Sequence, residues 1–352
     1  MRLDSPIKVL IVDDSPTVRQ VIAQVLDTQP DIIVMAEAAH PYEAREIIKK
    51  TAPDVIILDV EMPMMNGIDF LRRIMERRPT PVIMFSSLTQ KGSEDAIEAL
   101  ALGAIDCIGK TANFTTDGTL DLLPKMIRAA TKASLIPHRS PRSEDKSSQF
   151  EWDGKYILIG SSTGGVDALE TVLEGFPKNC PPTMIVQHMP RAFVESFAAR
   201  LNSRTHPLVK VAENGDLLAQ GCVYVAPGED THLEVEPGKV PKCKLIEGNK
   251  VSGHRPSVDV LFNSAVPIAK KTVAIILTGM GSDGAKGMKK LRENGARTLA
   301  QDQQTCVVYG MPRVAFECGG AERAMPLEKI SHHALDLCTK LGSPRNIRKV
   351  NV

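Results

Sequence analysis

Three side chains in the second half of the chain, Ser162, His188 and Asp283, are of the types that perform nucleophilic hydrolysis. Each comes at or just beyond the end of a short apolar run that predicts a buried strand. The runs are residues 156–159, 184–187 and 273–277. Because sites in parallel sheets gather outside the carboxyl ends of the strands, we expect the three side chains to converge. A serine hydroxyl becomes a nucleophile when an imidazole takes its proton, and a carboxylate orients that imidazole, so the pattern indicates a hydrolase.

A glycine-rich turn surrounds the serine. The segment Gly160–Gly165 follows the first of these runs and precedes apolar residues at helical spacing from Val166 onward. Backbone N–H groups at such a turn can hold an anionic ligand or the oxyanion of a reacting ester. A module that cradles a phosphate without doing chemistry is therefore a second interpretation. Against it, the segment matches neither of the glycine patterns typical of nucleotide-binding loops.

The first half of the chain predicts a different site. Asp13 and Asp14 end the first predicted strand and Asp59 ends the third, while Ser86 ends the fourth and Lys110 follows the fifth. Three carboxylates in one crevice repel one another unless a cation is present, and Mg²⁺ is the cation that suits such oxygen ligands. A hydroxyl and an ammonium aimed at the same pocket would bind an anion. The set predicts phosphoryl transfer onto Asp59.

Composition narrows the class of protein. The chain has 352 residues, 43% hydrophobic and 24% charged residues, and a formal net charge of +1, so no global field favours nucleic acid or an anionic membrane. No apolar stretch approaches the length of a membrane span. The 7 cysteines include no Cys-x-x-Cys pair and indicate reduced thiols rather than disulfides or zinc. We expect a cytoplasmic protein that neither binds nucleic acid nor inserts into a membrane.

Strands and helices alternate on both sides of a segment that lacks hydrophobic periodicity. That segment is rich in Ser, Pro and charge, and it predicts a linker over residues 129–153. The alternation predicts an α/β protein with two doubly wound parallel-sheet domains, residues 1–128 and 154–352. The first is expected to be flavodoxin-like and the second Rossmann-like. Residues 209–250 are richer in Gly, Pro and short runs and predict hairpins or a meander.

Residues 7–125 resemble a response-regulator receiver domain. The motifs are Val-Asp-Asp-Ser at 12–15, Leu-Asp-Val-Glu-Met-Pro-Met-Met-Asn-Gly at 58–67, Ser-Ser at 86–87, and Lys110. The resemblance implies that Asp59 is phosphorylated by a histidine kinase. It implies that Mg²⁺ is held by Asp14, Asp59 and the backbone carbonyl of Glu61, with Asp13 acting through water.

The same resemblance assigns the switch residues. Ser86 is the expected switch hydroxyl, and Lys110 is expected to contact the phosphoryl group. Two positions depart from the family pattern. Thr111 stands where a proline is common, and Cys107 stands at the position of the switch aromatic, so an aromatic rotamer switch is not expected here.

The second half resembles the bacterial chemotaxis protein-glutamate methylesterases. The motifs are Ile-Gly-Ser-Ser-Thr-Gly-Gly at 159–165, Gln-His-Met-Pro at 187–190, Gly-His-Arg-Pro-Ser-Val-Asp at 253–259, and Leu-Thr-Gly-Met-Gly-Ser-Asp-Gly at 277–284. Together with the receiver motifs, the likeness covers nearly the whole chain. We expect the run at 253–259 to lie near the site without a catalytic step of its own. Ser161 stands where the family usually has alanine, and it is expected to pack beneath the turn.

The resemblance implies the residue roles and the partners. Ser162 is the nucleophile, His188 the general base and Asp283 the residue that orients the base, with Thr163 and Met280 at the oxyanion hole. The expected substrates are methylated chemoreceptors, whose glutamyl esters would be hydrolysed to release methanol, and deamidation of receptor glutamines follows the same acyl chemistry. The receiver is expected to inhibit until it is phosphorylated. No cofactor is expected in the catalytic domain, and the chain is expected to be a monomer.

One further interpretation is a receiver with a transcriptional output. The net charge of +1 does not favour it, and no compact helix-turn-helix pattern with a basic recognition helix is present in the sequence.

Overall fold

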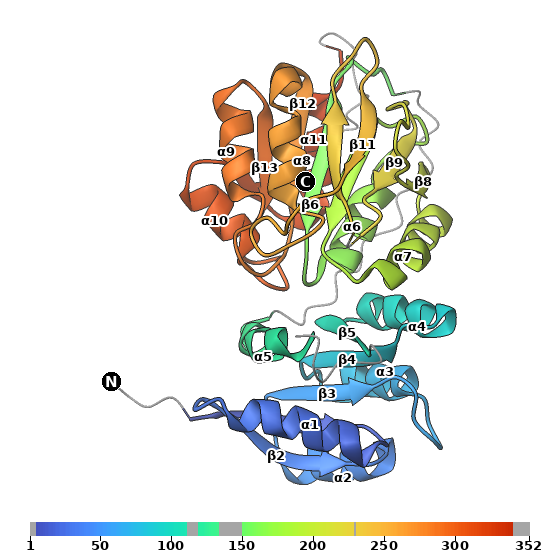
Figure 1. Cartoon of the computed structure of the whole chain (residues 1–352), viewed down its shortest axis with the longest axis vertical. Helices are drawn as coiled ribbons and strands as arrows, with labels where there is room; N and C mark the ends of the chain where they lie inside the picture. The colour runs from blue at the N-terminus through green and yellow to red at the C-terminus, as the bar shows by residue number, and fades with distance from the viewer. Residues whose placement is uncertain (1–4, 111–118, 134–149, 229, 341–352) are drawn as a thin grey trace, which may run out of the picture.

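The computed structural model describes residues 5–110, 119–133, 150–228 and 230–340. They form two α/β units stacked along the long axis of the molecule (Figure 1). Thr111 and much of the predicted linker 129–153 lie outside the described residues. The predicted fold class, two parallel-sheet α/β domains, is confirmed.

The first unit is built on a five-stranded parallel sheet in the order β2-β1-β3-β4-β5. This is the strand order of flavodoxin-like folds, with the reversal of direction between β1 and β3. Nearly every residue of β1, β3 and β4 is buried, as expected for strands covered on both faces by helices. The strands are β1 (Ile7–Val12), β2 (Ile32–Ala38), β3 (Val55–Asp59), β4 (Val82–Ser87) and β5 (Asp106–Lys110).

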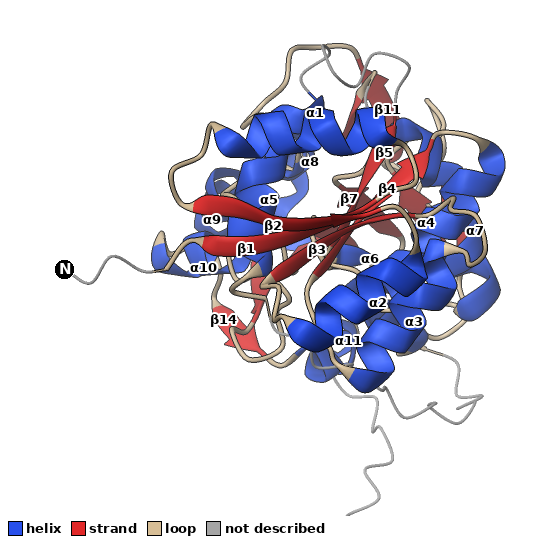
Figure 2. Ribbon diagram, turned by 90° about the horizontal axis from the view of Figure 1, so that it is seen from below, coloured by secondary structure: helices blue, strands red, loops and turns tan. Residues whose placement is uncertain are grey.

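Helices cover both faces of this sheet (Figure 2). They are α1 (Pro16–Asp27), α2 (Pro41–Lys50), α3 (Gly67–Arg77), α4 (Gln90–Ala101) and α5 (Leu123–Ala130), the last preceded by the 3₁₀ turn η1 (Thr119–Leu122). The predicted start of α1 is confirmed, because the Ser15 side chain accepts a hydrogen bond from the Val18 N–H and Pro16 occupies the first turn.

The second unit contains a seven-stranded parallel sheet in the order β14-β13-β12-β6-β7-β9-β8. Its first strand in the chain, β6, lies in the interior, so the chain adds strands first on one side of it and later on the other. The point beside β6 is therefore the topological switch at which ligands bind in such sheets. The strands are β6 (Tyr156–Ser161), β7 (Thr183–Gln187), β8 (Leu208–Val211), β9 (Cys222–Val225), β12 (Thr272–Ile276), β13 (Arg297–Gln301) and β14 (Arg323–Met325).

The helices of the second unit again lie on both faces of its sheet. They are α6 (Gly165–Glu174), α7 (Arg191–Arg204), α8 (Val258–Ser264), η2 (Val266–Lys271), α9 (Ala285–Glu293), α10 (Met311–Glu317) and α11 (Leu327–Leu337). None of the helices within the described parts of the chain combines the length and the hydropathy needed to span a bilayer.

The segment 209–250 differs in part from its prediction. β10 (His232–Glu236) and β11 (Lys242–Ile246) form the expected antiparallel hairpin. β8 and β9 instead join the parallel sheet beside β7, with Val209 paired with Val223. Short strands at the edge of a sheet carry a weak hydrophobic pattern, and only the neighbouring strand decides their direction.

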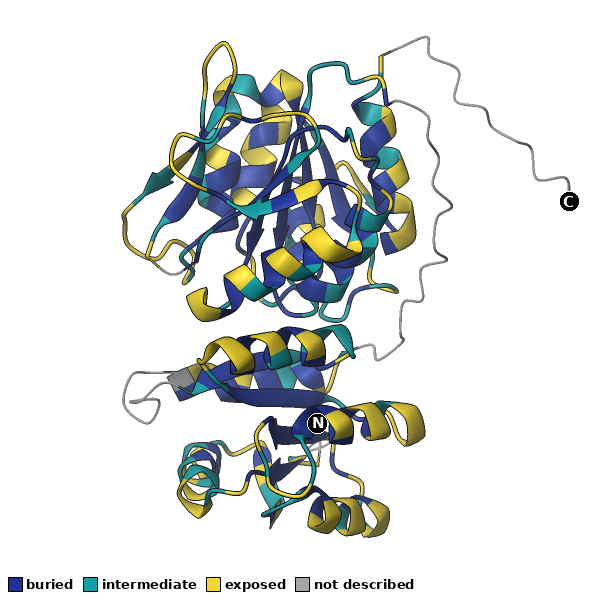
Figure 3. Ribbon diagram, turned by 90° about the vertical axis from the view of Figure 1, so that its right-hand side faces the viewer, coloured by how far each residue is buried: buried dark blue, intermediate teal, exposed yellow. Residues whose placement is uncertain are grey.

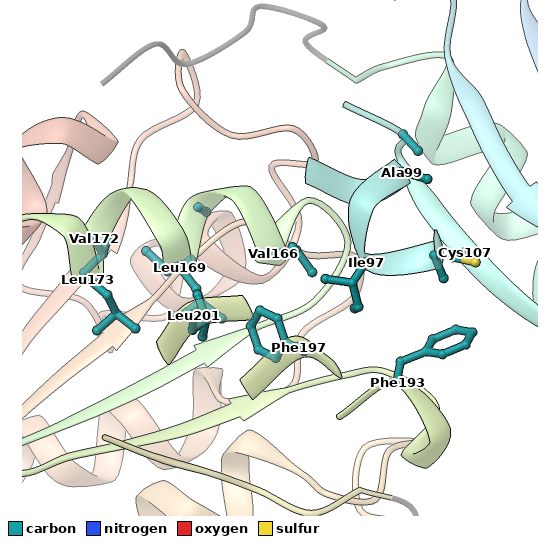
Figure 4. Close-up of a cluster of buried hydrophobic side chains, with 14 of the residues drawn as sticks. Ile97, Ala99, Cys107, Val166, Leu169, Val172, Leu173, Phe193, Phe197 and Leu201 are labelled. Carbon is teal, nitrogen blue, oxygen red and sulfur yellow. The ribbon is translucent and has the colours of Figure 1, made fainter. Parts of the chain in front are cut away.

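Buried side chains run through the middle of both units (Figure 3). One hydrophobic cluster crosses from the first unit into the second, and Figure 4 shows Ile97 and Cys107 beside Val166, Phe193 and Phe197. Helix α4 of the first unit packs against α7 and α6 of the second. The carboxyl edge of the second sheet is therefore covered by the first unit.

Candidate functional site

The second sheet brings the predicted hydrolytic residues to one edge. Ser162 directly follows β6, His188 directly follows β7, and Asp283 lies in the loop that leaves β12. Because β12, β6 and β7 are neighbours in the sheet, these three positions share the switch point beside β6.

His188 and Asp283 form a hydrogen-bonded pair. The distance between His188 Nε2 and Asp283 Oδ2 is 2.9 Å, and the Asp283 side chain is fully buried. Burial acts to raise the pKa of Asp283, but the hydrogen bond and charge of His188 outweigh it and hold the pKa below its ordinary value. An ionised carboxylate only accepts hydrogen bonds, so Nε2 carries the proton.

Four further donors satisfy the same carboxylate. They come from the start of α8 and from the adjacent loop. The donors are Ser257 Oγ at 2.7 Å, Val258 N at 2.7 Å, Asp259 N at 3.1 Å and Gly284 N at 3.0 Å. A buried anion is stable only when its lone pairs are matched in this way.

The other ring nitrogen of His188 is free to act as a base. Nδ1 is buried and has no hydrogen-bond partner within the described parts of the chain. Ser162 and His188 line the same small cavity. The Ser162 hydroxyl makes no hydrogen bond to any described residue, so the structure brings the two side chains into one cavity without joining them. Catalytic hydrogen bonds are often long in the absence of substrate and tighten in the complex.

The turn that carries Ser162 depends on glycine. Gly164 has φ of 78°, in the left-handed region, and a Cβ there would lie 2.5 Å from the Val307 Cβ. On the neighbouring loop, a Cβ on Gly279 would lie 2.8 Å from the Ser162 Cβ. Each of these two positions lets backbone approach the nucleophile closely.

Two unpaired backbone donors belong to the residues that directly follow Ser162 and Gly279. The N–H groups of Thr163 and Met280 have no acceptor among the described residues, whereas the Ser162 N–H is bonded to Thr278 O at 3.0 Å and the Gly165 N–H to Ser162 O at 2.7 Å. Unpaired donors beside a candidate nucleophile can stabilise a developing oxyanion.

The Gln187 side chain connects the loop that follows β6 with the loop that follows β7. Its Nε2 donates to Ser162 O at 2.9 Å and to His188 O at 3.0 Å, and its Oε1 accepts from Ser161 Oγ at 2.6 Å. Ser161 is fully buried, which confirms that it packs beneath the turn. The sequence analysis did not single out Gln187. Its position at the last residue of β7, one before His188, is the signal that could have found it.

The acidic cluster of the first unit is assembled as predicted. Carboxylate oxygens of Asp13, Asp14 and Asp59 all lie within 4.8 Å of one another. Lys110 Nζ lies 2.9 Å from Asp13 Oδ2 and 2.8 Å from Asp59 Oδ1. Burial, opposed by Lys110 and reinforced by Asp13, raises the pKa of Asp59 to about 6.

The single positive charge of Lys110 does not neutralise the negative charge of this cluster. Burial acts to lower its pKa, but Asp59 and Asp13 outweigh burial and raise it, so Lys110 stays charged. Three carboxylates and one ammonium leave excess negative charge, and this oxygen-rich set fits a hard divalent cation.

Ser86 and Glu61 lie beside the cluster, and their side chains form hydrogen bonds with other residues. Ser86 Oγ donates to Gly92 O in the first turn of α4 at 2.8 Å, and Glu61 Oε1 accepts from Ser87 Oγ at 2.9 Å. The Glu61 N–H donates to Asp59 Oδ1 at 3.3 Å. The predicted switch hydroxyl therefore contacts α4, the helix that packs on the second unit.

Comparisons with known proteins identify a family for each of the two units. A family model described as CheB methylesterase matches residues 157–334, and one described as Response regulator receiver domain matches residues 9–116. The chain is 50% identical over 343 residues to protein-glutamate methylesterase/protein-glutamine glutaminase 1 of Caulobacter vibrioides, covering 95% of this chain and 98% of that protein. The chain belongs to the CheB methylesterase family.

Other members of the CheB methylesterase family are similar over the same span. The protein-glutamate methylesterase/protein-glutamine glutaminase of Agrobacterium fabrum is 48% identical over 340 residues, covering 94% of this chain and 97% of that protein. The crystal structure of the Thermotoga maritima CheB methylesterase catalytic domain is 42% identical with a TM-score of 0.51, covering 53% of this chain and 99% of that one. The second unit is thus the methylesterase domain and the first unit the receiver domain.

The receiver domain covers the cavity at Ser162 and His188. The cavity at Ser162 and His188 is also lined by Leu100, Ala104, Asp106 and Cys107 of the receiver, and it measures about 20 Å³. That is room for one water molecule and for no substrate side chain.

A hydrogen bond crosses this interface. The Thr163 hydroxyl donates to Asp106 Oδ2 at 2.6 Å. Burial raises the pKa of Asp106, and the Thr163 hydrogen bond opposes that rise. The sequence analysis did not identify Asp106, because nothing in the order of residues shows that the two domains face each other here.

Replacing Gln187 with leucine tests the brace between the two loops of the methylesterase domain. Leucine keeps the volume but leaves the buried Ser161 hydroxyl without its acceptor and His188 O without its donor. We expect the free energy of unfolding to fall by about 1–3 kcal/mol, measured by urea denaturation. The exposed Gln220→Leu change is the matched control and should alter stability by less than about 0.5 kcal/mol. Equal stability of the two variants would contradict the brace.

Proposed function

We propose that this chain is a phosphorylation-activated protein-glutamate methylesterase that also deamidates protein glutamines. Its substrates are glutamyl methyl esters and glutamines on the signalling helices of chemoreceptors, the groups that the names of its relatives indicate. The observation that carries the proposal is the buried His188–Asp283 pair, which leaves Nδ1 without a partner among the described residues and lies with Ser162 at one cavity. Residues 1–128 act as the receiver, 129–153 as the linker and 154–352 as the catalytic domain.

The proposed reaction follows from which atoms are paired and which are free. Ser162 Oγ attacks the ester carbonyl while His188 Nδ1 takes its proton, and Asp283 stabilises the imidazolium. The N–H groups of Thr163 and Met280 hold the oxyanion. His188 then returns the proton to the departing methoxide, which leaves as methanol. Water attacks the acyl-enzyme by the same sequence and releases the glutamate; a glutamine substrate loses ammonia in place of methanol.

The receiver supplies the control in this proposal. A histidine kinase provides the phosphoryl group, and Asp59 accepts it. Mg²⁺, held by Asp14, Asp59 and the Glu61 carbonyl with Asp13 acting through water, would neutralise charge on the transferred group. Lys110, which already contacts Asp59 at 2.8 Å, would contact the phosphoryl oxygens, and Ser86 would serve as the switch hydroxyl.

Strand β5 offers a path from this event to the methylesterase site. Lys110, at its carboxyl end, contacts Asp59, and Asp106, at its amino end, contacts Thr163. The two ends of such a strand are roughly 13 Å apart. A phosphoryl group that draws Lys110 toward itself would act on the strand that carries Asp106, and Ser86 would act likewise on α4 through Gly92. Both β5 and α4 contribute residues that line the cavity, Asp106 and Cys107 from the strand and Leu100 from the helix.

Two adjacent serines provide a matched test of the nucleophile. We expect Ser162→Ala to lower methanol release from methylated receptors by about 10³-fold or more, because no other side chain can form the acyl-enzyme. Ser161→Ala should retain activity within about tenfold, since that hydroxyl bonds Gln187 beneath the turn. Methanol release is measured with both variants fully folded by circular dichroism. If Ser162→Ala stays active while Ser161→Ala is dead, the assignment of the nucleophile is wrong.

The two ends of β3 provide a matched test of phosphorylation. Asp59→Asn should abolish activation by a small phosphodonor, because it removes the acceptor carboxylate. Asp54, which precedes β3 and bonds the Lys8 N–H at 2.8 Å, is the control, and Asp54→Asn should be activated like the wild type. The measurement is the ratio of methanol release with and without phosphodonor and Mg²⁺. Full activation of Asp59→Asn would exclude that residue as the acceptor.

Removing the contact between Asp106 and Thr163 tests the inhibition. Asp106→Ala leaves the Thr163 hydroxyl without its acceptor, and loss of such a bond, worth about 1.5 kcal/mol, shifts the ratio of open to closed molecules about tenfold. We therefore expect higher basal methanol release without phosphodonor, up to the rate of a chain lacking residues 1 to about 140. Asp95→Ala is the control, since Asp95 lies on α4 and its Oδ2 has no hydrogen-bond partner among the described residues. Unchanged basal activity in both Asp106→Ala and the truncated chain would contradict inhibition by the receiver.

A further inference from the structure

A second histidine lies flat against His188. The ring centroids of His188 and His254 are 3.7 Å apart and the ring planes differ by 4°. His254 sits in the loop between β11 and α8, where it and Val251 exchange two backbone hydrogen bonds of 2.9 Å. The ring is therefore carried by a backbone that is itself held in place.

The same loop supports the partner of His188. Three residues after His254, the Ser257 hydroxyl donates to Asp283 Oδ1 at 2.7 Å, and the Val258 N–H donates to Asp283 Oδ2 at 2.7 Å. One short segment thus contacts the base on its flat face and holds the carboxylate that orients it. No role in the proposed reaction has been assigned to the His254 ring.

The stacked contact restrains the tilt of the His188 ring, which the Asp283 carboxylate cannot do. A single hydrogen bond from His188 Nε2 to Asp283 leaves the imidazole able to tilt about the line joining the two atoms. A flat ring at 3.7 Å removes that freedom on one side, and it also excludes water from that face. The contact lies against the face and not the edge, so it places no hydrogen-bond partner on Nδ1.

The charge state of His254 is consistent with restraining the His188 ring. Burial, reinforced by the nearby His188, lowers the pKa of His254 to about 4, with Asp283 opposing the shift and Lys250 adding to it. The ring is therefore neutral at neutral pH. A neutral neighbour adds no repulsion when His188 takes the serine proton.

We propose that His254 is a positioning residue for the hydrolysis, which stacks on the His188 imidazole and keeps Nδ1 aimed at Ser162. The inference rests on the proposed function. His254 itself exchanges no proton and contacts no substrate in this role, and it acts only through the His188 ring.

Three substitutions in the full chain, activated with phosphodonor, separate stacking from volume. His254→Ala removes the ring, His254→Leu keeps volume without a flat face, and His254→Phe keeps a flat face that cannot titrate. We expect kcat for methanol release to fall about 10-fold to 100-fold in the alanine and leucine variants with KM within about twofold, because a misplaced base affects the chemical step. The phenylalanine variant should recover to within about threefold of the wild type. The exposed His206→Ala is the control and should be unchanged.

A second assay separates failure of this inference from failure of the proposed substrate. A serine-directed phosphonate reacts with Ser162 at a rate that depends on the same Ser–His geometry and needs no receptor. Trapping that is slow in the alanine and leucine variants and restored in the phenylalanine variant supports the inference. It does so even if the wild type releases no methanol from receptors. Such a lack of methanol release would count against the proposed function alone. The role of stacking is overturned if, in either assay, the leucine variant reacts as fast as the phenylalanine variant or the alanine variant reacts as fast as the wild type.

Discussion

The methylesterase site depends on one buried negative charge. Asp283 is fully buried, and such a charge is tolerated only when it is paired and hydrogen-bonded. Five donors meet that demand, and they come from the residue that follows β7, from the loop before α8, from the start of α8 and from the turn after β12. Satisfying the charge thereby fixes one nitrogen of His188 and leaves the other without a partner among the described residues. The geometry on which the proposed reaction depends follows from an electrostatic requirement of the fold.

The glycine-rich turn is explained by the same site and not by phosphate binding. In a phosphate loop successive N–H groups remain free for the anion. Here the Ser162 and Gly165 N–H groups are bonded to carbonyls, and the N–H groups of Thr163, Gly164 and Met280, unpaired among the described residues, are divided between two separate loops. A turn with two of its own N–H groups already paired offers the several oxygens of a phosphate fewer donors, whereas a single oxyanion needs only one or two. The structure therefore favours the hydrolytic interpretation over the binding module.

The receiver closes this site through two kinds of contact. An apolar cluster that includes Ile97 and Phe193 continues across the boundary, and Asp106 bonds Thr163, a residue of the proposed oxyanion hole. Burial raises the pKa of Asp106, so the closed arrangement holds a carboxyl group that would be better solvated when the domains part. An interface that combines apolar packing with a hydrogen bond to a desolvated carboxyl group is one that a modest change in charge can bias.

The sequence by itself determined the fold class, the strand ends and the residue types that gather there. Continuous apolar runs specify buried parallel strands, and side chains such as Ser162, His188 and Asp59 directly follow them, so local order in the chain carries that information. Only the tertiary structure decided the rest. The pairing of β8 with β9, the brace at Gln187, the His254 stack and the contact from Asp106 to Thr163 all join residues that are distant in sequence. Such contacts follow from how sheets, loops and whole domains pack, and no periodicity or spacing along the chain records that packing.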